Sequence, residues 1–454
     1  MAETVKPSLR AVIVLGGGKS TRCSCTCRKQ FALIRGRPLL YWAVLFASMA
    51  APKTLIVLPM SDDVAPASYM PEGVSVLPTA PGNDRLEGVR IGLSSLTNVQ
   101  ENEYVIVHDG ARPLLTKADV DALMGAASHG YDAIGTAQEC EDTIEVANTF
   151  PDRRACRRSV TPQLFRLAAL QEAVKKQHQE FNQLHELLCL FPDEKRFMCV
   201  RSGRALFKVT WGWELGSVER MLLPSLGGTV LVTGGTRGIG RATAVLLLDM
   251  GFRVVVLARN EALFPQKVIA RPEFRSATAD VTHRKQLQAV VQQHLTEEAP
   301  LIAVVNCAGI GAMGSLTGVE DSELFSLMTT NSVGALHVAQ VALNLFPAGI
   351  NPVIGARGII INVGSSVLEG GRSNQTAYAM SKAVIPTLAA QLAVEHPDVL
   401  NFVVVPRRTD TDLRRAVAGR QEEGLATPDE VASTICTVLL ESNKFRNGQS
   451  LFVR

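Results

Sequence analysis

Tyr378 and Lys382 stand four residues apart and form a pair whose types and spacing could carry out acid–base chemistry. An unperturbed tyrosine has a pKa of about 10, so it exchanges protons poorly at pH 7 unless its phenolate is stabilised. Residues four apart lie on one face of a helix, where the ammonium of Lys382 would lower the pKa of Tyr378. We therefore expect Tyr378 to donate the proton that a carbonyl group needs when it accepts a hydride.

A glycine-rich turn earlier in the chain could hold the nucleotide that supplies such a hydride. The turn runs from Thr233 to Gly240, follows the apolar run 229–233 and precedes a helical pattern. Its glycines let the backbone approach a pyrophosphate, and the exposed amides of the helix N-terminus stabilise that anion. The predicted cofactor-binding residues of the turn are Gly234, Thr236, Arg237, Gly238, Ile239 and Gly240.

The end of the next predicted strand, 253–257, indicates which nicotinamide cofactor is used. Ala258, Arg259 and Asn260 follow it, so no acidic residue there can accept hydrogen bonds from the ribose 2′-hydroxyl. The guanidinium groups of Arg259 and Arg237 suit a 2′-phosphate instead. NADPH is therefore favoured over NADH.

Further polar residues follow the predicted strands in a characteristic order. Asn306-Cys-Ala-Gly309 follows the run 302–305, Asn331 lies in a later helical segment, and Ser365 and Ser366 follow the run 359–362. Together with the glycine turn and the tyrosine–lysine pair, this order resembles the short-chain dehydrogenase/reductase family over residues 228–454.

The resemblance implies a role for each of these residues. Lys382 would also bind the cofactor ribose, and Asn331 would complete a catalytic tetrad by fixing a water beside the lysine. The identity of the serine that polarises the carbonyl stays open, because local alignment favours Ser366 whereas the family's usual spacing of thirteen residues to the tyrosine favours Ser365. Further cofactor contacts implied by the resemblance are Asp280 beside the adenine, Asn306, Ala308 and Gly309.

The segment after Pro406 departs from the Pro-Gly that this family usually shows, because Arg407 and Arg408 come next. The equivalent loop of the family lies over the substrate. One hypothesis is that these arginines bind a substrate phosphate, and the alternative is that they begin a solvated helix.

The first half of the chain carries residues that suit transfer of a nucleotidyl group. Such a transfer depends on positioning and on neutralising spreading negative charge, which calls for arginine, lysine and carboxylate-held Mg²⁺. The apolar run 11–15 leads into a glycine-rich turn, and basic and acidic motifs follow it. The candidate residues, in order, are Gly16, Gly17, Gly18, Arg22, Lys29, Arg85, Asp109, Arg153 and Lys208.

In their order these motifs resemble the methylerythritol-phosphate cytidylyltransferase family, including its ribitol-phosphate relatives, over residues 10–222. The resemblance implies that Gly16 to Gly18 and Arg85 approach the nucleotide. It also implies that Arg22 and Lys29 hold the triphosphate of CTP.

The same resemblance makes Asp109 the ligand of Mg²⁺ and puts Arg153 and Lys208 near the sugar phosphate and the reacting groups. Two departures weaken it, since Ala205 replaces an acidic metal ligand and Gly88 replaces a serine that contacts cytosine. Loss of one metal carboxylate should weaken Mg²⁺ binding. An active transferase and a slow, altered or inactive one therefore both stay open.

The apolar runs that precede these motifs predict the fold. Runs rich in valine, isoleucine and leucine are typical of strands buried on both faces of a parallel sheet, so both halves should be α/β, doubly wound, Rossmann-like domains. A helical stretch ends near Leu222 and a new strand starts at once. We therefore expect a cytidylyltransferase-like domain at 1–225 and a short-chain reductase domain at 226–454.

Composition agrees with a globular protein. The 454 residues are 46% hydrophobic, enough for each domain to bury a core, and the net charge of +3 indicates no nucleic-acid or membrane-surface partner. The N-terminus shows neither a secretory signal nor a membrane span, which predicts a cytoplasmic protein. The nine cysteines form no regular framework, so we expect reduced thiols, and the cluster Cys23-Ser-Cys25-Thr-Cys27 is interpreted as loop cysteines.

The order of the two halves resembles two-domain enzymes of bacterial capsule synthesis. In these, a short-chain reductase converts D-ribulose 5-phosphate to D-ribitol 5-phosphate with NADPH, and a cytidylyltransferase activates the product with CTP to CDP-ribitol. The partners implied are CTP, a pentitol or sugar phosphate and further copies of the chain, since both families usually form dimers or tetramers. Two alternatives remain: a methylerythritol-phosphate cytidylyltransferase fused to a separate reductase, and a reductase carrying a non-catalytic binding or dimerisation module.

Overall fold

The computed structural model divides the chain into two compact units, Met1–Leu222 and Leu223–Arg454. It describes residues 6–17, 28–59, 70–71, 73–79, 85–140, 142–145, 149–176, 187–191, 197–201, 206–211, 214–225, 227–260, 264–411, 413 and 425–453. Of the helices in these ranges, none combines the length and the apolar character that crossing a membrane requires.

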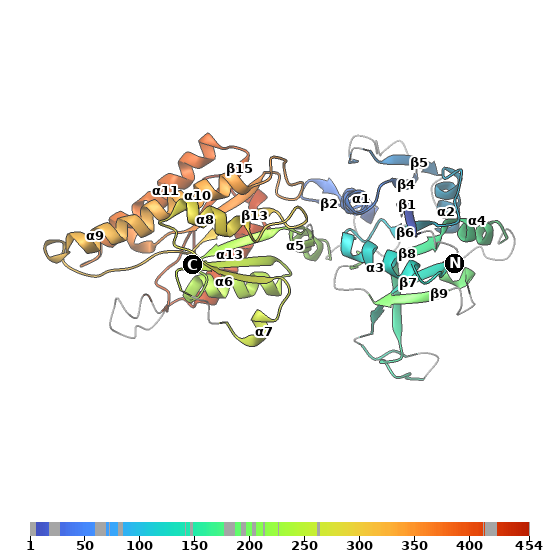
Figure 1. Cartoon of the computed structure of the whole chain (residues 1–454), viewed down its shortest axis with the longest axis horizontal. Helices are drawn as coiled ribbons and strands as arrows, with labels where there is room; N and C mark the ends of the chain where they lie inside the picture. The colour runs from blue at the N-terminus through green and yellow to red at the C-terminus, as the bar shows by residue number, and fades with distance from the viewer. Residues whose placement is uncertain are drawn as a thin grey trace. The chain divides into compact units, whose positions relative to one another are not determined.

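The first unit is built on a seven-stranded sheet with the order β5-β4-β1-β6-β8-β7-β9 (Figure 1). Its strands are β1 (Ser8–Leu15), β4 (Thr54–Pro59), β5 (Ser75–Thr79), β6 (Glu103–Asp109), β7 (Ala133–Glu139), β8 (Arg157–Arg166) and β9 (Phe197–Arg201). The predicted apolar runs form β1, β4 and β6, which are parallel. Strand β8 differs, since it runs antiparallel to both neighbours and begins with exposed arginines rather than an apolar run.

Helices cover both faces of this sheet (Figure 1). They are α1 (Leu39–Ala50), α2 (Arg85–Ser94), α3 (Lys117–Ala127) and α4 (Leu167–Lys176), and a small hairpin of β2 (Leu33–Ile34) and β3 (Arg37–Pro38) precedes α1. Helix α5 (Leu215–Ser225) contains the point at which the chain divides into its two units. Apolar residues of α2 and α4 pack together against β1, β4 and β6 in one buried cluster. Helix α3 begins with a capping box, in which Thr116 and Asp119 satisfy each other's backbone amides.

The second unit is built on a seven-stranded sheet with the order β12-β11-β10-β13-β14-β15-β16. Its strands are β10 (Thr229–Thr233), β11 (Arg253–Ala258), β12 (Phe274–Thr278), β13 (Leu301–Asn306), β14 (Gly358–Val363), β15 (Val399–Val405) and β16 (Ser450–Phe452). All neighbours are parallel. The order reverses between β10 and β13, and in open α/β sheets ligands bind at the carboxyl ends of the strands beside such a switch point.

Helices α8, α10 and α11 cover one face of this sheet and α6 and α13 the other (Figure 1). The helices are α6 (Gly238–Asp249), α7 (Gln266–Ile269), α8 (Arg284–Gln292), α9 (Asp321–Leu327), α10 (Gly334–Leu345), α11 (Thr376–Glu395) and α13 (Pro428–Leu440). A π-helix, Met328–Val333, joins α9 to α10. Two α/β units with largely parallel sheets confirm the predicted fold class.

Candidate active sites

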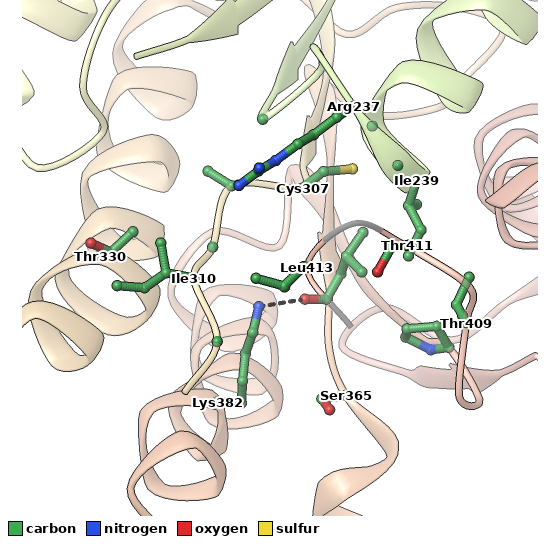
Figure 2. A pocket seen from close by; sticks show the side chains of 18 of the residues that line it. Arg237, Ile239, Cys307, Ile310, Thr330, Ser365, Lys382, Thr409, Thr411 and Leu413 are labelled. Atoms are coloured by element: carbon green, nitrogen blue, oxygen red, sulfur yellow. Dashed lines mark hydrogen bonds between the residues drawn. The ribbon is translucent and has the colours of Figure 1, made fainter. Parts of the chain in front are cut away.

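A cavity of about 360 Å³ opens at the carboxyl ends of β10, β11, β13 and β14 (Figure 2). It lies where the strand order reverses, and most residues predicted from the second half line it. Those that do are Gly234, Thr236, Arg237, Gly238, Ile239, Gly240, Arg259, Asp280, Ala308, Gly309, Ser365, Ser366, Tyr378 and Lys382. Asn306 and Asn331 are buried beside this wall, at 4% and 1% exposure.

The glycine turn after β10 is so closely packed that side chains would not fit. A Cβ built on Gly234 would lie 2.8 Å from the amide nitrogen of Ala308, and one on Gly240 would lie 2.5 Å from the carbonyl oxygen of Gly234. Gly238 has a φ of +53°, a region that favours glycine, and begins α6. The turn therefore brings backbone amides and a helix N-terminus to the cavity, an arrangement that fits the pyrophosphate of a dinucleotide.

A chain of buried polar side chains joins three neighbouring strands below this turn. The Thr233 hydroxyl donates to Oδ1 of Asn306 over 2.7 Å, and Nδ2 of Asn306 donates to Oδ1 of Asn362 over 3.0 Å. The amide of Ala308 donates to the Thr233 hydroxyl at 3.4 Å. Asn306 thus supports the cofactor loop from behind rather than lining the cavity.

Tyr378 and Lys382 lie one turn apart on α11, and both line the cavity. Lys382 is only 7% exposed, and its Nζ donates to the carbonyl oxygen of Val363 at 3.4 Å, the dashed line in Figure 2. A buried ammonium needs such partners, and this bond directs Nζ to the end of β14. The lysine is therefore held at the cavity wall by its surroundings.

Asn331 lies in the π-helix, a form of helix that is frequent at functional sites. Its amide bonds to both backbone groups of Ile310, at 2.8 and 2.9 Å, and to the Ser381 hydroxyl at 2.9 Å. A Cβ built on Gly309 would lie 3.1 Å from Oδ1 of Asn331 and 3.2 Å from Nζ of Lys382. The glycine therefore keeps open the space between these two groups, where a water was predicted.

The two candidate serines differ in their surroundings. Ser365 is half-buried, and its hydroxyl oxygen accepts a bond from the amide of Val367 at 3.3 Å. Ser366 is 6% exposed, and its hydroxyl oxygen accepts a bond from Nη2 of Arg372 at 3.0 Å. Sequence reasoning had not identified Arg372, because its role depends on the path of the loop after β14.

The wall of the same cavity also carries the groups predicted to bind the adenosine part of the cofactor. Arg237 and Arg259 both line it, and Figure 2 shows Arg237 reaching across the space above the loop of Cys307. Desolvation raises the pKa of Asp280, but hydrogen bonds from Thr282 and the charge of Arg259 outweigh it, so the pKa is lowered and the carboxylate stays ionised. Burial raises the pKa of the Cys307 thiol to about 12, which keeps it protonated and unreactive.

In the first unit, Asp109 at the end of β6 gathers three basic residues from distant segments. Nη1 of Arg85 donates to Oδ1 of Asp109 at 2.9 Å, Nζ of Lys208 donates to Oδ2 at 2.8 Å, and Nε of Arg112 lies 3.6 Å from Oδ2. Desolvation raises the pKa of Asp109, yet the positive charges of Arg85, Lys208 and Arg112 lower it far more, so the carboxylate is always ionised near neutral pH. Arg112 is a member of this cluster that sequence reasoning did not assign to the site.

The neighbours of Asp109 hold this cluster in place. Its backbone amide donates to the Thr161 hydroxyl at 3.0 Å, and Nη2 of Arg85 donates to Oε1 of Gln163 at 3.4 Å. Thr161 and Gln163 both belong to β8. His108 is fully buried and donates from Nε2 to the carbonyl of Arg112 over 2.8 Å. Burial lowers the pKa of His108 to about 4, so its ring is neutral at pH 7.

The remaining residues predicted in this half are less completely placed. Gly16 and Gly17 follow β1, and the carbonyl of Gly16 accepts a hydrogen bond from the Gln30 side chain. Lys29 begins a short helix, Lys29–Phe31, and Arg153 lies on an exposed turn before β8. Gly88 lies inside α2, where a Cβ would come within 3.1 Å of Leu15, so packing accounts for a glycine there. Gly18, Arg22, Ala205 and the clustered cysteines 23, 25 and 27 lie outside the described residues.

The described residues do not form a metal site around Asp109. They contain no group of three or more His, Cys, Asp and Glu side chains able to hold a metal ion. Both oxygens of Asp109 already accept hydrogen bonds from cations, whereas Mg²⁺ usually takes oxygen ligands from one or two carboxylates and from substrate phosphates. The metal role of Asp109 stays a prediction.

Two family models match the chain, one in each unit. A model of the short chain dehydrogenase matches residues 228–422, and a model of 2-C-methyl-D-erythritol 4-phosphate cytidylyltransferase matches residues 10–193.

Individual relatives show the same division. Ipsdienol dehydrogenase of Ips pini is 31% identical over 204 residues, which are 42% of this chain and 79% of that enzyme. 2,3-Dihydro-2,3-dihydroxybenzoate dehydrogenase of Escherichia coli is 30% identical over 230 residues, 46% of this chain and 88% of that enzyme. The bifunctional enzyme IspD/IspF of Sphingopyxis alaskensis is 36% identical over 183 residues, 38% of this chain and 45% of that enzyme.

Proposed function

The second unit of this chain belongs to the short-chain dehydrogenase family, and from that premise we propose that it reduces D-ribulose 5-phosphate to D-ribitol 5-phosphate with NADPH. The first unit is a cytidylyltransferase-like domain, and we propose that it transfers CMP from CTP to the ribitol 5-phosphate, giving CDP-ribitol. Both domain families are enzymes, so the chain combines a reductase with a nucleotidyltransferase. The choice of sugar and of cofactor is the part that we propose.

One observation carries the reductase proposal: the tyrosine–lysine pair, the glycine turn with its Arg237, and Arg259 all line a single cavity. The two arginines support NADPH, since two guanidinium groups suit the 2′-phosphate that distinguishes it from NADH. When bound, NADPH would supply the hydride.

The residues of the cavity can complete this reduction. As the carbonyl carbon of the substrate accepted the hydride that bound NADPH would supply, the carbonyl oxygen would take a proton from the Tyr378 hydroxyl. The ammonium of Lys382, fixed by Val363, stabilises the phenolate charge that remains on the tyrosine. Solvent then returns a proton to Tyr378, so one carbonyl, one NADPH and one proton give one alcohol and one NADP⁺.

We assign the polarising hydroxyl to Ser365. It lines the cavity, is more exposed than Ser366, and stands at the family's usual spacing from Tyr378. The bond that its oxygen accepts from Val367 leaves the hydroxyl proton to be donated to a substrate carbonyl. Ser366, which is held by Arg372, would support the turn.

In the first unit, a phosphate oxygen of ribitol 5-phosphate attacks the α-phosphorus of CTP, and the bond to the β-phosphate breaks to release pyrophosphate. The protein's contribution is positive charge in a fixed place. Arg85, Arg112 and Lys208 provide it, and Asp109 holds all three in position. This arrangement supports an active transferase despite the departures at Ala205 and Gly88.

We also propose that the protein is a cytoplasmic homo-oligomer. The nine cysteines form no regular framework in the sequence, which is typical of proteins in a reducing compartment. Phe325, Leu336 and Met380, on α9, α10 and α11, are exposed by 69%, 42% and 58%, and such apolar side chains support self-association. Light scattering of the purified protein tests this point.

The first experiment supplies purified protein with D-ribulose 5-phosphate, NADPH, CTP and Mg²⁺, and follows NADPH absorbance and pyrophosphate release together. Pyrophosphate release that requires NADPH would support the two coupled reactions. Addition of D-ribitol 5-phosphate should remove the need for NADPH, and Tyr378→Phe should block the coupled assay but not this bypass.

Other outcomes select the alternatives. NADPH oxidation without pyrophosphate release from any polyol phosphate would favour a non-catalytic first unit. CTP turnover with methylerythritol phosphate but not ribitol phosphate would favour the isoprenoid-type transferase. Absence of both signals would reject D-ribulose 5-phosphate as the substrate.

A further inference from the structure

The cavity of the second unit is strongly positive. Among the described residues that line it, the basic side chains outnumber a single carboxylate, that of Asp280. The basic residues are Arg237, Arg259, Arg372, Lys382, Arg407 and Arg408. Arg237 and Arg259 are accounted for by the cofactor and Lys382 by proton transfer, which leaves Arg372, Arg407 and Arg408.

Arg372 differs from the other two arginines because it is tied to the catalytic turn. Its Nη2 donates to the hydroxyl of Ser366 at 3.0 Å and to the carbonyl of Ser366 at 3.1 Å. By contrast, Arg407 is 47% exposed and lies 3.8 Å from Glu430, a long ion pair at the surface. Arg372 is therefore the arginine whose position is set by the residues that surround the reacting carbonyl.

The loop that carries Arg372 is also fixed at a second point. The amide of Gly314 donates to the carbonyl of Asn374 at 3.0 Å, and Asn374 has a φ of +60°. These contacts tie the loop to the segment after β13 on one side and to the turn after β14 on the other. A guanidinium that is ordered before the ligand arrives loses less entropy on binding than a mobile one.

We propose that Arg372 binds the anionic group of the substrate and that the reductase therefore acts on carbonyl compounds that carry a phosphate. A planar guanidinium matches the geometry of phosphate oxygens, and a charge-assisted bond in a partly buried cavity is strong. Through Ser366, the same side chain connects the bound anion to the turn that carries Ser365. This inference rests on the proposed reductase function but does not depend on the sugar being ribulose.

The test compares matched pairs of substrates that differ only in the phosphate. D-Ribulose 5-phosphate and D-ribulose form one pair, and dihydroxyacetone phosphate and dihydroxyacetone form another. Initial rates of NADPH oxidation give kcat and KM for the wild type, Arg372→Gln and Arg372→Lys. Arg284→Gln is the control, because Arg284 is an exposed arginine on α8 that contacts Gln340 rather than the cavity.

We expect the wild type to prefer the phosphorylated member of a pair, and Arg372→Gln to raise the KM for that member by about 10- to 100-fold. The KM for the unphosphorylated member should change by less than about threefold. Arg372→Lys, which keeps the positive charge but not the planar guanidinium geometry, should recover part of the lost affinity. Arg284→Gln should leave all values unchanged.

The possible failures are distinguishable. If ribulose 5-phosphate is not reduced but another phosphorylated ketose is, with the same dependence on Arg372, the proposed sugar is wrong and the inference holds. If Arg372→Gln raised the KM of both members of a pair equally, Arg372 would act only through Ser366. That result would overturn the inference. A wild type that prefers unphosphorylated substrates, or reduces no phosphorylated one, would overturn it as well.

Discussion

Asp109→Asn should destabilise the first unit far more than loss of one surface charge would. The carboxylate is 14% exposed and stands among Arg85, Arg112 and Lys208, whose side chains are 20%, 10% and 37% exposed. Asparagine has a similar shape but no charge. Three neighbouring cations would then repel one another with nothing to balance them.

The size of this effect can be estimated from the burial of the cluster. Removing one partner of a buried ionic group costs about 3–5 kcal/mol. We take the lower end, about 3 kcal/mol, because Lys208 is partly screened by solvent. For a unit of this size the loss corresponds to a fall of about 6–12 °C in the midpoint of thermal unfolding.

The assay is thermal unfolding of the full chain followed by calorimetry, in which the transition of the first unit should move and that of the second should not. The control is Asp121→Asn on α3, where the pair with Lys117 is more than half exposed and the change should be below about 0.5 kcal/mol. Adding Lys208→Met to Asp109→Asn should restore part of the stability. A single variant as stable as the wild type would refute the view that this carboxylate holds the cluster together.

Three further predictions concern catalysis, cofactor choice and pH. Tyr378→Phe should lower the rate of NADPH oxidation by about 100-fold or more, as expected for loss of a general acid, while calorimetric binding of NADPH is unchanged. Arg237→Ala combined with Arg259→Ala should weaken NADPH binding by at least about tenfold and leave NADH binding nearly unchanged, measured by cofactor fluorescence. His108 has a folded pKa of about 4, below its unfolded value of about 6.5, so the stability it contributes is complete above pH 6.5 and is lost as pH falls towards 4. Unfolding of the first unit at pH 7 and pH 5 should therefore differ more in the wild type than in His108→Gln.

Each of these expectations has a result that would contradict it. Retention of most activity by Tyr378→Phe would remove the tyrosine from the proton-transfer step. If the double arginine variant weakened the binding of NADPH and NADH equally, the arginines would not recognise the 2′-phosphate. An unchanged pH dependence in His108→Gln would assign the acid sensitivity to other groups.

The reductase fold and much of its cavity were predictable because the relevant residues stand at the ends of strands. Parallel strands buried on both faces are continuous apolar runs, and whatever follows each run must arrive at the same edge of the sheet. The glycine turn, Gly309 and Ser365 were found in this way, Tyr378 was found by its spacing from Lys382 on a helix, and all line one cavity. No such rule applies to Arg372, since its contact with Ser366 depends on the conformation of an irregular loop.

The first unit was less predictable for a related reason. Strand β8 begins with exposed arginines, so its antiparallel course and its bonds to the Asp109 site leave little trace in the pattern of apolar residues. The cluster itself joins Arg85, Asp109 and Lys208 from three separate segments. Their order in the sequence indicates that these residues belong to the motifs of one family. Only the folded chain shows that they contact one another.

The polar chain of Thr233, Asn306 and Asn362 links accuracy of folding to the ability to bind cofactor. A slip of one residue in β10, β13 or β14 would place these amides opposite valine or isoleucine and leave buried polar groups without partners. Purely aliphatic strands would tolerate that slip much better. The same three side chains fix the register of β10, β13 and β14, and therefore the relative positions of the glycine turn, the Ala308 loop and the serine turn that follow these strands. A sheet with the wrong register would lose both its stability and a usable cavity. Any redesign of this core that replaces the three residues by aliphatic ones is therefore expected to yield several registers, only one of them competent.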